Sequence, residues 1–328
     1  MQNPEHIEKQ IALYLSTIKD ILEDKNVSEI MVTADGCVWV EKNGNIENSG
    51  LVLAEAERKL ALINIAKAVG RDMHANTESA VVSTSVGGLR FAGALKPIDA
   101  RGTTLCIRKH QDPERRPSLE MLVEWKMLTQ QQADLLVRLI IVEKKNAVFI
   151  GPTSGGKTTL ANAVLGKLPH YERIGSIEDA HELSINVANK DCLLTNPQAG
   201  ITSRLLIQHA MRSRYDRLIL GESRGDDTFD LIRALSSGHN GSVTTIHGSG
   251  AIEGLGTLEM LYQMSLPPGA SVPVETARGF IASAINLLIY TERKYEPTGS
   301  GEFKSVRSVK EIALVKGVEN GKYQIEHL

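Results

Sequence analysis

The stretch AVFIGPTSGGKTTL, residues 147–160, contains the pattern GxxxxGK[ST] at Gly151, Gly156, Lys157 and Thr158. An apolar, strand-like run precedes the pattern and a helical run follows it, which is the context that a phosphate-binding loop requires. The glycines let backbone N–H groups turn toward phosphates, and the start of the helix adds its dipole. Lys157 offers a positive charge to the β- and γ-phosphates, and Thr158 a hydroxyl group to Mg²⁺. The competing interpretation is a glycine-rich turn without a ligand. It is disfavoured because the lysine, the hydroxyl group and the flanking strand and helix all occur at the positions that a phosphate-binding loop requires.

We expect the whole loop to take part in nucleotide binding, because backbone N–H groups along such a loop turn toward the phosphates. Each charge-assisted contact contributes about 1.5–3 kcal/mol. The predicted nucleotide-binding residues are Gly151, Thr153, Ser154, Gly155, Gly156, Lys157, Thr158 and Thr159.

From residue 119 onward, helical runs alternate with short apolar strand-like runs. Helices are expected over 119–128, 129–145, 158–168, 203–212, 227–238 and 254–264, and strands over 147–150, 173–179, 217–222 and 242–247. Alternation of this kind, with short apolar strands, indicates an α/β domain around a parallel sheet. The last forty residues read as mixed strands and turns.

The first 110 residues follow another pattern. Helical periodicity over 7–23 and 55–70 is interspersed with β-rich runs, which include a hairpin signal around the DG turn at 35–36 and a β-like stretch over 80–109. This composition predicts a compact α+β domain. The segment QDPERRPS, 111–118, combines two prolines with four charges and is typical of a linker. The predicted organisation is therefore an N-terminal domain over 1–110, a linker over 111–118 and an α/β domain over 119–328.

Polar side chains follow three of the predicted strands at their carboxyl ends. Glu178 and Asp179 follow the strand RIGSI, Glu222 follows RLILG, and His247 ends SVTTIH. Ligands of open α/β sheets bind at this edge, and carboxylates there can hold a metal ion's water shell or orient an attacking water. The competing interpretation for each acid is a helix cap. His247 can sense a phosphate by hydrogen bonding, whereas His239, at the opposite end of its strand, is interpreted as structural.

Nucleotide hydrolysis also calls for arginines that neutralise charge in the transition state. The sequence does not choose among its candidates, which are Arg90, Arg101, Arg108, Arg204, Arg212, Arg214 and Arg224.

Composition narrows the class of protein. The net charge of −2 and the aromatic content of 4% carry no signature of a nucleic-acid-binding protein, so nucleic acid is disfavoured as the main ligand. The three cysteines form no CxxC pair and indicate neither a zinc site nor a disulfide framework. The chain opens without a signal-peptide pattern, and its longest apolar run, 280–290, is too short to span a membrane. We expect a cytoplasmic protein that reaches a membrane only through partners.

Four blocks in this order resemble the type IV secretion traffic ATPase family of the secretion ATPase superfamily, most of all its conjugative-transfer members. They are GPTSGGKTTL (Walker A), SIEDAHEL (Asp box), LILGESR (Walker B) and GSVTTIHG (His box). The segments EIMVTADGCVWVEKNG and LRFAGALKP are similar to the family's N-terminal hairpin and first arginine strand. The resemblance implies a RecA-like P-loop ATPase core with a smaller N-terminal α+β domain, and ATP and Mg²⁺ as ligands.

The resemblance also implies roles for residues. Glu178 and Glu222 match the catalytic carboxylates, with Thr158 and Glu222 at the metal ion, and His247 matches the residue that couples the phosphate to movement. Arg90 and Arg108 match the N-terminal arginines that reach the nucleotide. A further basic pair, Arg212 and Arg214, matches a run that faces a neighbouring subunit. The family implies a homo-hexameric ring with nucleotide between the two domains, docked on inner-membrane components of a secretion or conjugation machine.

The sequence departs from the family pattern at a few places. Tyr215 stands where proline is usual, Gly248 stands where alanine is common, and the stretch TESAVVSTSVGG lacks the Pro and Asp often found before the arginine strand. The four-cysteine zinc element of the type II secretion branch is absent. A pilus-retraction motor, a nucleic-acid translocase and a nucleotide-gated scaffold are the alternatives. The sequence leaves open the docking partner, the moved substrate, the ring's symmetry, the carboxylate that activates water and the arginines that act across subunits.

Overall fold

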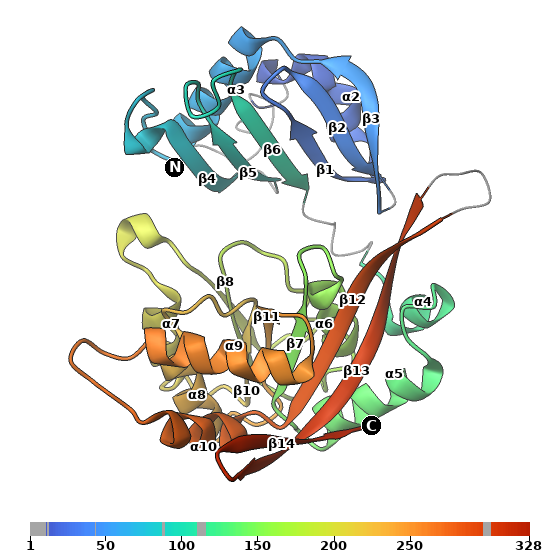
Figure 1. Ribbon diagram of the computed structural model, residues 1–328, viewed down its shortest axis with the longest axis vertical. Helices are drawn as coiled ribbons and strands as arrows, with labels where there is room; N and C mark the ends of the chain where they lie inside the picture. The colour runs from blue at the N-terminus through green and yellow to red at the C-terminus, as the bar shows by residue number, and fades with distance from the viewer. Residues whose placement is uncertain (1–10, 12, 43, 87–88, 110–115, 298–302) are drawn as a thin grey trace. The chain divides into compact units, whose positions relative to one another are not determined.

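The computed structural model describes residues 11, 13–42, 44–86, 89–109, 116–297 and 303–328, and Figure 1 shows their course. The chain divides into two compact units. Unit one comprises Met1–Gln111 and Pro297–Ser305, and unit two comprises Asp112–Glu296 and Val306–Leu328. The linker predicted over 111–118 lies, apart from residues 116–118, outside the described residues, so the domain boundaries stay a prediction.

Unit one is built on an antiparallel sheet with the strand order β3-β2-β1-β6-β5-β4. The strands are β1 (Val27–Val32), β2 (Cys37–Lys42), β3 (Asn45–Val52), β4 (Val81–Val86), β5 (Leu89–Ala94) and β6 (Thr104–Lys109). The helical segments are η1 (Ser16–Ile18), α2 (Lys19–Glu23), α3 (Glu55–Ala68) and η2 (Glu78–Ala80). The helix predicted over 7–23 begins outside the described residues and ends in α2.

Helix α3 confirms the helix predicted over 55–70 and packs on this sheet. Ala61, Leu62 and Ile65 are buried at helical spacing along it. Its contact with β5 is close: a Cβ atom on Gly93 would lie 2.6 Å from Leu62 Cδ1. Glycine in β5 therefore lets the helix approach the sheet.

Unit two contains a larger sheet with the strand order β14-β13-β12-β7-β11-β10-β8-β9. The strands are β7 (Ala147–Gly151), β8 (Ile174–Glu178), β9 (Lys190–Leu194), β10 (Arg217–Leu220), β11 (Val243–His247), β12 (Leu287–Pro297), β13 (Phe303–Glu319) and β14 (Lys322–His327). All neighbouring pairs from β12 to β9 run parallel, so the predicted parallel sheet is confirmed. β13 and β14 form an antiparallel hairpin, and β9 is an additional edge strand that the alternation did not predict.

Helices cover both faces of the sheet in unit two (Figure 1). They are α4 (Leu119–Glu124), α5 (Gln130–Leu136), the π-helical turn η4 (Val137–Val142), α6 (Lys157–Leu165), η5 (Pro197–Ala199), α7 (Ser203–Ala210), α8 (Thr228–Ser236), α9 (Ala251–Met264) and α10 (Val274–Ala284). Ala147 and Phe149 face the core formed with α4, α5 and α6, whereas Val148 and Ile150 face the core formed with α7 to α10. Burial on both faces explains why β7 is apolar at every position.

The apolar run 280–290, predicted to be one buried helix or strand, is divided between two elements. Helix α10 ends at Ala284 and β12 begins at Leu287. Between them, Asn286 exchanges hydrogen bonds with Asn146: Asn146 N–H donates to Asn286 Oδ1 (2.9 Å), and Asn286 N–H donates to the Asn146 carbonyl (3.0 Å). A polar pair just before β7 therefore ends the helix and sets β12 in register with the central strand.

Candidate functional site

The loop between β7 and α6 has a backbone that demands glycine. Ser154 and Gly156 are left-handed, with φ of 56° and 88°. A Cβ atom on Gly155 would lie 2.9 Å from the Pro152 carbonyl oxygen, and one on Gly156 would lie 2.7 Å from Met127 Cε. The backbone oxygen leaves no space for a side chain at Gly155, whereas Met127 Cε ends a flexible side chain, so at Gly156 the left-handed backbone is the stronger requirement for glycine.

Lys157 begins α6 and turns back over this loop. Its side chain is only 7% exposed, and Nζ donates to the carbonyl oxygens of Gly151 and Pro152, each at 2.9 Å. Thr158 and Thr159 follow in the first turn and are half-buried. No side chain caps the start of α6, so its first N–H groups are available to an anion. The residues of this loop fit a nucleotide's phosphates.

The order of the strands brings the predicted polar residues to the same edge of the sheet as the loop. β11 lies beside β7, with His247 in register with Gly151, and β10 and β8 follow. Glu222 stands two residues beyond the end of β10, and Glu178 is the last residue of β8. Four segments that are separate in the sequence therefore present their carboxyl ends together.

An ion-pair network links three of these segments. His247 Nε2 lies 2.8 Å from Glu222 Oε1, and Arg224 Nε donates to Glu222 Oε2 at 2.7 Å. Arg224 also pairs with Asp179 through Nη1, and Thr195 donates to Asp179 Oδ1 at 2.7 Å. Sequence reasoning listed Arg224 among seven candidates without choosing it. Its position two residues after Glu222 was the available signal.

Glu178 is a carboxylate in a dry environment. It is 6% exposed, and its Oε1 accepts N–H donors from Glu182 (2.8 Å) and Leu183 (2.6 Å). Burial raises the pKa of Glu178 to about 7, although these N–H groups and Arg116 favour the charged form. Asp227 also has a raised pKa, about 6, because it is buried. A proton acceptor that titrates near neutrality is therefore present at the carboxyl end of β8, at the sheet edge that also bears the loop.

Arg90 and Arg108 belong to unit one. They are cross-strand neighbours on β5 and β6, and Arg108 also stands opposite Glu29 on β1. Arg90 is half-buried and Arg108 is exposed. Two like charges directly opposite each other are unfavourable in a sheet, and Glu29 offsets part of this repulsion at Arg108.

The remaining predicted residues have simpler surroundings. Arg212 and Arg214 are exposed. His239 is buried, with Nδ1 3.0 Å from the Ala234 carbonyl oxygen, which is a structural setting. Within the described part of the chain, no cluster of three or more His, Cys, Asp or Glu side chains could hold a metal ion. A magnesium ion in the loop would thus depend on phosphate oxygens, with Thr158 and Glu222 as the protein's contribution.

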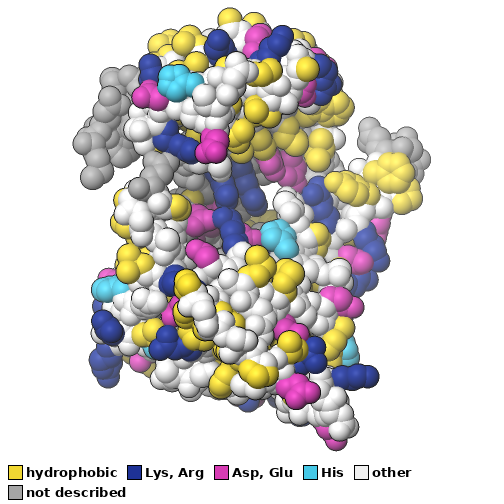
Figure 2. All heavy atoms as spheres, turned by 60° about the vertical axis from the view of Figure 1, so that its left-hand side comes forward, with side chains coloured by type: hydrophobic (Ala, Val, Ile, Leu, Met, Phe, Trp, Pro, Cys, Tyr) yellow, Lys and Arg dark blue, Asp and Glu magenta, His cyan; other side chains and the backbone are white. Residues whose placement is uncertain are grey.

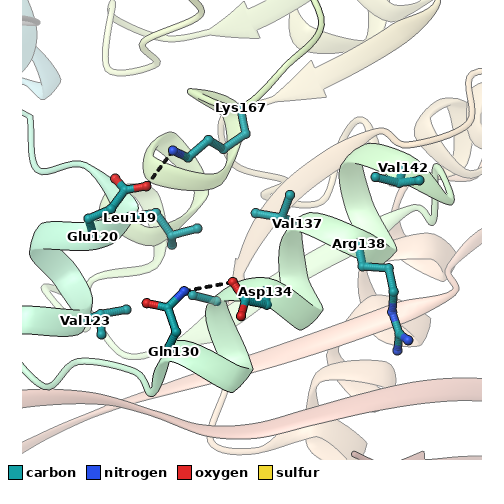
Figure 3. Close-up of a pocket in the computed structure, with 10 residues that line it drawn as sticks. Leu119, Glu120, Val123, Gln130, Asp134, Val137, Arg138, Val142 and Lys167 are labelled. Atoms are coloured by element: carbon teal, nitrogen blue, oxygen red, sulfur yellow. Dashed lines mark hydrogen bonds and ion pairs between the residues drawn. The ribbon is translucent and has the colours of Figure 1, made fainter.

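One surface feature of unit two is separate from these residues. A cavity of about 420 Å³ lies among α4, α5, η4 and Lys167, where Lys167 pairs with Glu120 at 2.6 Å (Figure 3). It includes none of the predicted site residues.

On the face drawn in Figure 2, basic and acidic side chains are interspersed. The helices of the described ranges are all too short or too polar to cross a bilayer.

Residues 82–306 match the model of the type II/IV secretion system protein family. The chain belongs to this family. Every predicted site residue, from Arg90 to His247, lies within the matched region of this type II/IV secretion system protein.

Relatives of this secretion system protein match it over most of its length. It is 31% identical over 311 residues to the conjugal transfer protein TrbB of Rhizobium radiobacter, covering 93% of this chain and 89% of the relative. It is also 31% identical to the type IV secretion system protein PtlH of Bordetella pertussis, over 87% of this chain and 91% of the relative. These relatives confirm the resemblance to the type IV secretion branch of the family.

The solved structure of the Legionella pneumophila ATPase DotB has a similar fold. It superposes with a TM-score of 0.60 at 16% identity, over 90% of this chain and 79% of the other. The predicted fold class, an α/β core with a smaller α+β domain, is therefore confirmed for this secretion system protein.

Proposed function

We propose that this protein is an ATP-hydrolysing motor that powers a type IV secretion or conjugative DNA-transfer apparatus. One observation carries the proposal. Glu222, His247, Arg224 and Asp179 form a single network at the sheet edge that also bears the phosphate-binding loop. The similarity to TrbB over 93% of the chain supports the biological setting.

Residues of the loop bind and orient the nucleotide. ATP with Mg²⁺ supplies the phosphoanhydride bond and the cation that neutralises phosphate charge. The N–H groups at the start of α6 and the Lys157 ammonium bind the phosphates, and Thr158 and Glu222 hold the metal ion. His247 keeps Glu222 oriented through their 2.8 Å contact.

We assign to Glu178 the role of the general base, which accepts the proton of the attacking water. Its raised pKa, about 7, makes it a stronger base than an ordinary carboxylate and still leaves it largely ionised slightly above neutral pH. The N–H groups of Glu182 and Leu183 hold one carboxylate oxygen in place, so that the other remains for water.

Further parts of the proposal concern assembly. The facing pair Arg90 and Arg108 offers the positive charge that phosphate needs. We propose a homo-hexameric ring that acts at the cytoplasmic face of the inner membrane through components of the secretion machine. Nucleic acid is not its main ligand.

The first test is ATP turnover per subunit across a range of protein concentrations, with the oligomer's mass measured in the same samples. We expect turnover per subunit to rise steeply as a six-subunit species forms, because arginines from a neighbour complete the site. Flat turnover by a monomer would contradict the ring mechanism. Strong, salt-sensitive binding of single-stranded DNA would instead favour a translocase.

Turnover should also depend on pH through Glu178. Because the pKa in the folded protein is raised to about 7, the carboxyl is protonated below that value, and turnover should rise as pH increases from about 6 to 8. Glu178→Gln should turn over slowly and lose this rise. Asp227, with its pKa of about 6, provides the control: if the rise survives in Glu178→Gln but disappears in Asp227→Asn, Glu178 is not the base.

A further inference from the structure

The left-handed conformation of Ser154 needs support from outside the loop. A residue with a Cβ atom adopts this conformation at a cost, and such conformations persist where the surroundings hold them. The peptide group between Ser154 and Gly155 is held from both sides. Gly155 N–H donates to the Pro152 carbonyl at 3.1 Å, and the Ser154 carbonyl accepts Arg307 Nε at 2.7 Å.

Arg307 comes from β13, 153 residues further along the chain. Its stem also lies against the loop, since a Cβ atom on Gly156 would be 3.6 Å from Arg307 Cδ. The sequence pattern of the last forty residues carried no indication of this contact. The guanidinium donor of this bond is charged. A hydrogen bond from a charged donor to a carbonyl is stronger than one from a neutral donor.

A second contact from the same strand supports the loop. Val309 N–H donates to the Met127 carbonyl at 2.7 Å. Met127 is buried, and its Cε is the atom that a Cβ on Gly156 would meet at 2.7 Å. β13 therefore holds the outer side of the loop at two positions, directly through Arg307 and through Met127.

We propose that Arg307 is a positioning residue of the phosphate-binding loop, which keeps the Ser154–Gly155 peptide in the orientation that binds nucleotide. This inference rests on the proposed function. It assigns the C-terminal hairpin a part in nucleotide binding. Arg307 acts through the loop's backbone and leaves phosphate contact to Lys157 and the N–H groups of α6.

The test compares Arg307→Ala with the wild-type full-length chain in titrations with a fluorescent ATP analogue, with and without Mg²⁺. We expect roughly tenfold weaker binding in Arg307→Ala, because a charge-assisted hydrogen bond to the loop is lost. KM for ATP should rise by a similar factor while kcat changes less. Arg307→Lys should recover part of the affinity, because lysine also donates to a carbonyl. The thermal midpoint without nucleotide should change little.

Lys310→Ala is the matched control, since Lys310 is an exposed cation on the same strand and pairs with Glu292 at 3.5 Å. It should bind the analogue as the wild type does. If Arg307→Ala does not fold, Arg307→Gln replaces it in the same titration. Wild-type affinity for the analogue in Arg307→Ala or Arg307→Gln overturns the inference. A loss of affinity in Lys310→Ala equal to that in Arg307→Ala also overturns it.

The outcomes also separate this inference from the proposed function. If Lys157→Ala no longer binds the ATP analogue and Arg307→Ala still binds it as the wild type does, only the role proposed for Arg307 is refuted. If the wild-type chain neither binds nor hydrolyses ATP, the proposed function falls and this inference with it.

Discussion

Lys157→Ala is expected to abolish ATP hydrolysis, with turnover at least about 100-fold below that of the wild type. Its ammonium group lies in the phosphate-binding loop, 2.9 Å from the carbonyl oxygens of Gly151 and Pro152, on a side chain that is 7% exposed. Two charge-assisted contacts to phosphate, at about 1.5–3 kcal/mol each, would be lost together. Steady-state turnover and titration with a fluorescent ATP analogue measure the effect.

Lys167→Ala is the matched control for this substitution. Lys167 follows the last turn of α6 and pairs with Glu120 at 2.6 Å on the surface, so its removal should leave turnover unchanged. Circular dichroism and the thermal midpoint establish that both variants fold. Turnover of Lys157→Ala within threefold of the wild type would show that the loop is not the nucleotide site.

Arg217→Ala should cause the largest loss of stability in unit two. Arg217 is fully buried and pairs with Glu172, itself 1% exposed. Its guanidinium also donates to the carbonyls of Ile141 (2.8 Å) and Gly241 (3.1 Å), which joins β10 to η4 and to the turn before β11. Lys144 also pairs with Glu172, at 2.8 Å, so Arg217→Ala leaves this buried carboxylate only partly compensated. Removing one partner of a buried ion pair costs about 3–5 kcal/mol.

Thermal and chemical unfolding measure this loss. A change of that size lowers the midpoint of a unit of this length by roughly 6–20 °C. Arg138→Ala provides the comparison, because Arg138 lies in η4, is 64% exposed and pairs with Glu143 only at 3.7 Å. Its removal should cost less than about 1 kcal/mol. Equal effects of the two substitutions would refute the structural role given to Arg217.

Local sequence patterns predicted four parallel strands of the larger sheet and the motifs at their ends. β7, β8, β10 and β11 were predictable because each is a short run with apolar residues, set between helical runs. The loop at 151–157 was predictable because its glycines, lysine and hydroxyl are contiguous. A parallel sheet places the carboxyl ends of its strands at one edge, so Glu178, Glu222 and His247 could be expected at the same edge as the loop. All of these signals are local in the chain.

The contacts between distant side chains, and the burial of those side chains, depend on the tertiary structure. Arg224 reaches Asp179 across 45 residues, and Arg307 reaches Ser154 across 153. No local pattern predicts either of these long-range contacts, because both depend on how distant elements pack. The raised pKa of Glu178 has the same origin, since it follows from burial, and burial is a property of the assembled core.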